Sequence, residues 1–122
     1  MAGTVVTTEI THASVKKVSF DWLSSAAGAA DATTTAVFNG RVIYVVFESD
    51  SGGTAPTDLW DCTVKDAGGI DVCKGLGANV TAAATVYKAD SDGLGAVCES
   101  ALTLAVTNAG NAKGGIVTLF IR

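Results

Sequence analysis

The chain has 122 residues, which gives room for one domain and one core. Its formal net charge is −4 and it contains no basic run, so we expect no binding to nucleic acid, where neutralisation of phosphates dominates affinity. No stretch approaches the roughly 20 apolar residues of a membrane helix, so we expect no contact with a membrane. The opening residues MAGTVVTTEITHAS lack the pattern of a secretory signal, so we expect synthesis in a cytoplasm.

The composition favours strands over helices. Fourteen glycines, a single proline and many threonines are typical of short strands joined by glycine turns. We therefore predict an all-β fold, a single-domain antiparallel β-sandwich or flattened barrel of about seven or eight strands spanning residues 1–122. Residues 1–14 would form an extended N-terminal strand or arm.

The first two predicted strands differ in clarity. Thr4–Thr11 alternates loosely and suits a strand at a sheet edge, or one that reaches a neighbouring molecule. Val15–Leu23 alternates well, with Val18, Phe20 and Trp22 on one side, the period of two expected of a half-buried strand. The small, polar segment that follows, SSAAGAADATTT, has no periodicity, and we expect a loop there rather than a helical turn.

The next segment holds the predicted centre of the sandwich. Thr35–Phe38 would form a short strand, and the Asn39-Gly40 pair after it is a strong hairpin signal. Val42–Phe47 is an unbroken apolar run rich in β-branched and aromatic residues, which favours a strand covered on both faces.

Residues 48–58, ESDSGGTAPTD, are turn-forming residues between two strands. A loop of this length in a small domain is either mobile or functional, so we predict an interaction loop. A second predicted interaction site is the N-terminal arm. The loop residues are Glu48, Asp50, Ser51, Gly52, Gly53, Thr54, Pro56 and Asp58, and the arm residues are Val5, Val6, Thr8 and Ile10.

A tight hairpin is predicted from Leu59 to Cys73. A three-residue loop at 67–69 places Val64 opposite Val72, whereas a two-residue loop would place Cys62 opposite Cys73 but Val64 against an aspartate. We favour the first register, in which the two cysteines point to opposite faces. With an odd count of three cysteines, we expect free, partly buried thiols.

The C-terminal third supplies the last predicted strands. Thr85–Lys88 is a short candidate, and Ser100–Thr107 with Ile116–Arg122 would form a terminal antiparallel hairpin. The residues expected to build most of the core are Val18, Phe20, Trp22, Val42, Tyr44, Val46, Trp60, Val64, Leu102, Leu104, Val106, Val117, Leu119 and Ile121.

No motif indicates catalysis. The string Asp50-Ser51-Gly52-Gly53 resembles the nucleophile segment of trypsin-type proteases, but His12 is the only histidine and lies far away in sequence. The cysteines have no CxxC spacing, and Asp90–Gly93 supplies only the first half of a calcium loop. We therefore expect no enzyme activity, no catalytic residue, no metal and no cofactor, although Glu48, Asp50 and Asp58 keep a weak surface calcium site open.

Three stretches resemble small structural proteins encoded by tailed bacteriophages and prophages. They are GTVVTTEITHASVKKVSFDW, DSGGTAPTDLWDCTVKDAGGIDVCKGLGANVT and LTLAVTNAGNAKGGIVTLFIR. The resemblance implies a non-enzymatic virion protein. Within that class we favour a capsid decoration, or cement, protein: a small β-rich domain, often trimeric, on the outside of the phage head, bound to the major capsid protein or another virion protein.

Two alternatives stay open. A neck or tail component would suit an all-β domain equally well. A carbohydrate-binding, adhesin-like module would require Trp22 or Trp60 to be exposed, with residues 48–58 as the binding site, although both tryptophans are in phase with the apolar face of their strands, which favours burial.

Overall fold

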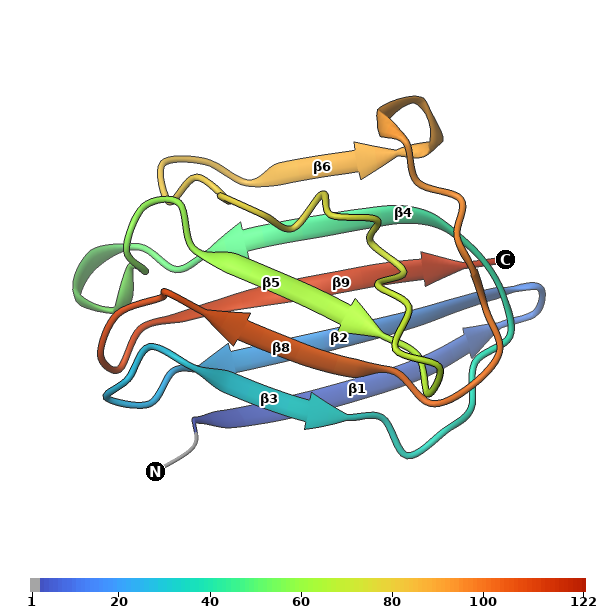
Figure 1. The fold of residues 1–122 in the computed structure, drawn as a ribbon, viewed down its shortest axis with the longest axis horizontal. Coiled ribbons are helices and arrows are strands. Elements are labelled where there is room, and N and C mark those ends of the chain that lie inside the picture. Colours follow the sequence, from blue (N-terminus) through green and yellow to red (C-terminus); the bar gives the residue numbers. More distant parts are fainter. Residues whose placement is uncertain (1–2) are drawn as a thin grey trace.

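A computed structural model describes residues 3–122 as two facing antiparallel sheets (Figure 1). This confirms the predicted all-β class. The strands are β1 (Thr4–His12), β2 (Val15–Leu23), β3 (Ala30–Thr33), β4 (Gly40–Ser49), β5 (Asp61–Lys65), β6 (Val86–Ala89), β7 (Val97–Cys98), β8 (Thr103–Thr107) and β9 (Gly114–Ile121). Two short 3-10 helices are η1 (Gly52–Thr54) and η2 (Asp90–Asp92).

The larger sheet has six strands in the order β1-β2-β9-β4-β6, with β7 paired to the start of β4. The smaller sheet has three strands in the order β3-β8-β5 and covers one face of the larger one (Figure 1). The core lies between the two sheets, where alternate side chains of β2, β4 and β9 meet those of β5 and β8. Among residues 3–122, no second layer of strands covers the opposite face of the larger sheet.

Most of the predicted core is confirmed. The two tryptophans lie at its centre, with ring centroids 4.9 Å apart, and the indole Nε1 of Trp60 donates a hydrogen bond to Ser49 Oγ at 2.9 Å. The predicted residues that are buried are Val18, Phe20, Trp22, Val42, Trp60, Val64, Leu102, Leu104, Val106, Val117, Leu119 and Ile121.

The prediction was wrong for Tyr44 and Val46, which are only half-buried. The register between β4 and β9 shifts after Val42, which faces Ile121, because a β-bulge inserts one extra residue. The inward positions beyond the bulge are therefore Val45 and Phe47, both fully buried. The expectation that β4 is covered on both faces is also wrong beyond the bulge, where only the side that faces the smaller sheet is covered.

The third strand also differs from the prediction. Strand β3 lies at residues 30–33, within the segment expected to be a loop, while residues 35–38 are not a strand. Pairing with β8 outweighs the weak strand propensity of alanine and aspartate here. The Asn39-Gly40 pair forms no hairpin, because the chain crosses there from the smaller sheet to the larger one.

The predicted C-terminal hairpin is wrong, because β8 and β9 belong to different sheets. The connection between them contains left-handed residues, including Asn108 at φ 60° and Gly110 at φ 88°. Ser24 Oγ donates to the Gly110 carbonyl at 2.6 Å and accepts from the Lys113 N–H at 2.9 Å. These bonds hold the connection between β8 and β9 at the end of β2, where the chain passes from the smaller sheet to the larger one.

The hairpin after β5 has the favoured register. Gly69 is left-handed at φ 83°, and the Val72 N–H donates to the Val64 carbonyl at 2.8 Å. No regular second strand follows, because Asp71 Oδ1 accepts the Cys73 N–H at 3.0 Å and Oδ2 accepts the Gly75 N–H at 2.9 Å, which turns the chain away.

The three cysteines are free and buried, which confirms the expectation of free thiols. The expectation that Cys62 and Cys73 point to opposite faces is wrong: both are in the core, since the turn that follows Asp71 directs Cys73 inward. Burial raises the pKa of the Cys62, Cys73 and Cys98 thiols, so they are protonated near neutral pH and poorly reactive.

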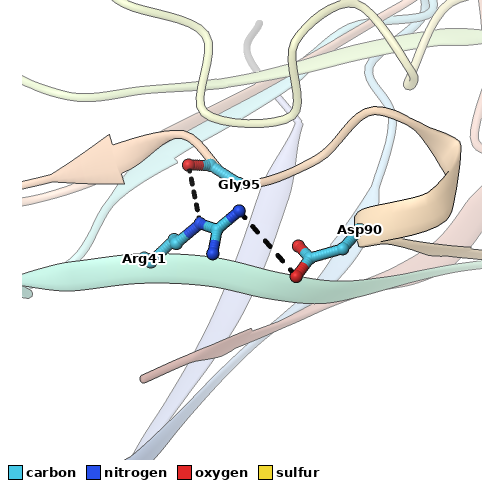
Figure 2. A network of polar contacts seen from close by, with 3 residues as sticks. All are labelled: Arg41, Asp90 and Gly95. Carbon is cyan, nitrogen blue, oxygen red and sulfur yellow. Dashed lines mark hydrogen bonds and ion pairs between the residues drawn. The ribbon is translucent and has the colours of Figure 1, made fainter.

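A polar cluster fixes the segment between β6 and β7 to the larger sheet. Arg41, near the start of β4, donates from Nε to the Gly95 carbonyl at 3.2 Å, and its Nη2 lies 3.9 Å from Asp90 Oδ2 (Figure 2). Asp92 accepts the Ala89 N–H at 2.9 Å. Asp90 and Asp92, which belong to the sequence that resembles half a calcium loop, are therefore both engaged in contacts within the molecule.

Candidate interaction surface

The uncovered face of the larger sheet is the most extensive candidate surface. We call it the outer face and define it by the outward residues of its strands in register. They are Thr4, Val6, Thr8 and Ile10 on β1; Lys17, Ser19, Asp21 and Leu23 on β2; Ile116, Thr118 and Phe120 on β9; Tyr44, Val46 and Glu48 on β4; and Tyr87 and Ala89 on β6.

Aromatic side chains gather on β9, β4 and β6, toward the β6 edge of the outer face. Tyr44 and Tyr87 are stacked at 26° with centroids 6.2 Å apart, and Tyr44 meets Phe120 at 6.0 Å. Lys17 Nζ lies 5.9 Å from the centroid of the Phe120 ring, within cation–π range. Tyr87 remains 59% exposed. Tyrosine is enriched at protein interfaces because it combines a large apolar ring with a polar tip.

The outer face is better suited to a protein than to a small molecule. No pocket occurs among residues 3–122, and small-molecule sites are concave. One face of the Tyr87 ring is turned toward the Tyr44 ring. An opposing protein surface could cover the aromatic cluster and the apolar residues beside it, such as Val46 and Ile116.

The predicted arm is strand β1, which pairs with β2 along its whole length and forms an edge of the larger sheet. Val6, Thr8 and Ile10 point to the outer face and are exposed, while Val5 points inward and packs against the core. The arm residues thus belong partly to the same surface as the aromatic cluster.

The predicted interaction loop, residues 48–58, is held by several hydrogen bonds to itself and to neighbouring segments. Asp50 Oδ2 accepts the Thr54 hydroxyl at 3.2 Å, and the Gly53 carbonyl accepts Lys113 Nζ at 2.9 Å. Pro56 is buried, and Asp58 Oδ1 accepts the Ala82 N–H at 2.9 Å. Two of its carboxylates and one of its carbonyl groups therefore already accept hydrogen bonds from within the molecule.

The structure does not bring the loop residues into one site. Glu48 lies on the outer face opposite Ile116, Gly52 and Gly53 are exposed in η1, and Asp58 contacts the segment after residue 80. Within residues 3–122 no group of three or more histidine, cysteine, aspartate or glutamate side chains could hold a metal ion.

The protease-like string lies in the η1 turn. Ser51 follows the end of β4, whereas His12 ends β1, and these two strand ends lie at opposite ends of the sandwich (Figure 1).

In the described part of the chain, no helix is both long and apolar enough to cross a membrane.

The aromatic cluster is the functional candidate that sequence reasoning missed. The sequence predicts Tyr44 in the core because the bulge in β4 has no evident sequence signal. The pairing of Val46 with Tyr87 links residues 41 positions apart, which alternation alone does not reveal. A usable signal was Tyr87, the one aromatic residue of a short strand with few large apolar neighbours in the sequence.

Comparisons with protein-family models, with curated protein sequences and with solved structures found no match.

The carboxylate of Asp61 should make the stability of the fold depend on pH. Its carboxylate accepts the Asn79 N–H at 2.8 Å and the Asn108 amide at 2.6 Å, and these bonds lower its pKa below the usual value. A lowered pKa contributes stability above the pKa of the unfolded chain, and this contribution is lost as pH falls through the folded value. We expect Asp61→Asn to cost about 1 kcal/mol at pH 7.

Urea unfolding at several pH values checks this expectation. The difference between the wild type and Asp61→Asn should shrink as the pH falls below about 4, where the aspartate of the unfolded chain becomes protonated. Asp31→Asn, at an exposed position of β3, is the matched control. A difference that stays constant down to pH 2 would contradict a role for the Asp61 charge.

Proposed function

We propose that this chain is a non-enzymatic structural protein of a bacteriophage virion, a capsid decoration protein that binds the outside of the head through its outer face. The observation that carries the proposal is the uncovered aromatic cluster of Tyr44, Tyr87 and Phe120 on the outer face. Exposed apolar patches rimmed by polar residues mark protein interaction sites. The resemblance of three sequence stretches to phage structural proteins indicates the class of partner.

The charges around the cluster suit a protein partner. Lys17, Asp21 and Glu48 lie beside the apolar residues on the same face, so both signs are available at its border. Interfaces commonly have such a polar rim around an aromatic centre. The partner we propose is the major capsid protein, with the neck or tail as the alternative location in the virion.

The alternative of a carbohydrate-binding module loses its predicted stacking residues. Trp22 and Trp60 are 1% and 0% exposed, and they pack against each other in the core. The interaction loop is held by internal hydrogen bonds.

Co-sedimentation with purified phage heads that lack the protein tests the proposal. We expect saturable binding by the wild type and at least about tenfold weaker binding by Tyr87→Lys, because an aromatic residue that anchors an interface often contributes 2 kcal/mol or more. Val37→Lys is the control, since Val37 is 70% exposed in the connection before β4 and lies off the outer face.

Other outcomes would change the proposal. Binding to purified tails but not to heads would support the neck or tail location. Equal loss of binding in both lysine variants would contradict the outer face as the docking surface. If the wild type binds neither heads nor tails, the virion function itself is wrong.

A further inference from the structure

Strand β1 presents an open sheet edge. It is the terminal strand of the larger sheet, and within residues 3–122 its only strand partner is β2. In an antiparallel ladder, every second residue of such a strand points its N–H and C=O away from the sheet. Natural edges are usually blunted by lysine, proline, bulges, short length or an inward-pointing charge. Strand β1 has none of the first four features over nine residues in unbroken register, and its one carboxylate is that of Glu9 on the inner side of the sheet.

The single carboxylate of β1 does not protect the edge. Glu9 is directed toward the connection after β3, where its oxygens accept the Ala36 N–H at 2.9 Å and the Thr35 N–H at 3.2 Å. Its charge is therefore engaged within the same molecule, and an approaching strand would not meet it as a free carboxylate.

The turn between β1 and β2 shows which residues face outward. It consists of Ala13 and Ser14, with His12 opposite Val15. In a two-residue hairpin the flanking residues form a hydrogen-bonded pair, and the pattern alternates from there. Even-numbered residues of β1 therefore bond to β2. The residues whose backbone groups face outward are Val5, Thr7, Glu9 and Thr11.

We propose that two copies of this chain pair antiparallel through β1 about a two-fold axis at Thr8, which joins their larger sheets into one. In this register the whole strand, Thr4–His12, overlaps with its partner. Val6 lies opposite Ile10 of the second copy, and both are exposed in the single chain, at 68% and 38%. A two-fold interface is self-complementary, so the apolar pair occurs twice.

Other registers fit less well. A shift by one residue would place outer-face residues beside inner-face residues, because side chains alternate with a period of two. A shift that centres the pair on Thr7 places Val5 opposite Glu9 and Val6 opposite Thr8. That register separates the apolar residues and shortens the overlap.

The other edge of the sheet favours the same conclusion. Strand β6 has four residues, and the antiparallel sequence of pairings makes it run in the same direction as β1. A head-to-tail ring through β1 and β6 would thus use a short parallel pairing. The edge predicts a dimer, in contrast to the trimer that the resemblance implies, and this inference holds whether or not the outer face binds a capsid.

Light scattering over a range of protein concentrations tests the pairing. We expect the mass of the wild type to rise from one chain toward twice that value. Val6→Lys should keep the mass of one chain at concentrations where the wild type is dimeric. Val97→Lys should remain dimeric, because Val97 is also 68% exposed but lies on β7, away from the edge. A trimeric mass, a wild type monomeric throughout, or equal dissociation of both variants would overturn the proposal.

A cysteine at the two-fold axis tests the register. Only residue 8 meets its own copy on the outer face, and residues opposite each other in a non-hydrogen-bonded pair have Cα atoms about 4.5 Å apart, within disulfide range. We expect Thr8→Cys to form a covalent dimer under mild oxidation and Thr4→Cys to remain monomeric on a non-reducing gel. The native cysteines are buried and contribute little background. A Thr8→Cys protein that stays unlinked would overturn this register.

Discussion

Val45→Lys is expected to destabilise the fold by about 4 kcal/mol or more, whereas Val46→Lys should cost about 1 kcal/mol or less. Val45 is fully buried beside Leu119, and Lys88 is its partner in β6, so a second ammonium group there would lack both water and a counter-charge. Val46 lies half-buried on the outer face between Thr118 and Tyr87. A lysine at that position can extend over the tyrosine ring and keep its charge in water.

Urea unfolding followed by circular dichroism measures both variants, which carry the same substitution at adjacent residues. The contrast depends on the bulge between Val42 and Tyr44. An unbroken alternation from Val42 would instead bury Val46, as the sequence suggests. The reverse order of stabilities would therefore show that β4 keeps a single phase and that Tyr44 is not on the outer face.

The elements predicted well from the sequence are those whose pattern is local. Strand β2 has the predicted bounds, and its alternating Val18, Phe20 and Trp22 are buried. The hairpin after β5 has the predicted register because one pairing matches Val64 with Val72 while the other opposes Val64 to an aspartate. In both cases the sequence contains apolar residues whose spacing distinguishes the two faces.

The elements predicted poorly depend on partners that are distant in sequence. Strand β3 contains alanines and an aspartate, and it is a strand because β8 pairs with it. Strands β8 and β9 look like a hairpin, yet Ser24 anchors their connection and the two strands enter different sheets. Alternation reports which side chains share a face but not which sheet a strand joins.

The candidate interaction surface follows from the same irregularity in β4. The bulge moves Tyr44 out of the core and places it between Phe120 and Tyr87, which come from strands at either side of β4. The predicted arm residues Val6 and Ile10 lie on the same face at the β1 edge. Pairing two copies along that edge would join two aromatic clusters on one continuous sheet, which doubles the surface available to a partner with matching symmetry.

Gly115→Ala is expected to destabilise the fold by about 3 kcal/mol, as overpacking of a tightly packed site does. A Cβ atom there would clash with the Glu48 carbonyl and lie 2.8 Å from Cζ2 of Trp22. The carbonyl belongs to β4, which pairs with Gly115 in β9, so it cannot move without separating the two central strands. The indole is held between the sheets by Trp60, and its displacement would disturb the centre of the core.

Gly53→Ala is the matched control, because a Cβ atom at Gly53 meets nothing within 4 Å and its φ is not in the left-handed region. We expect that variant to equal the wild type or gain up to about 0.5 kcal/mol, since alanine reduces the freedom of the unfolded chain. Thermal unfolding gives the stabilities, and near-ultraviolet circular dichroism reports on the tryptophan pair. Equal stability of the two alanine variants would contradict the close contact between β9, β4 and Trp22 on which the packing of the two sheets depends.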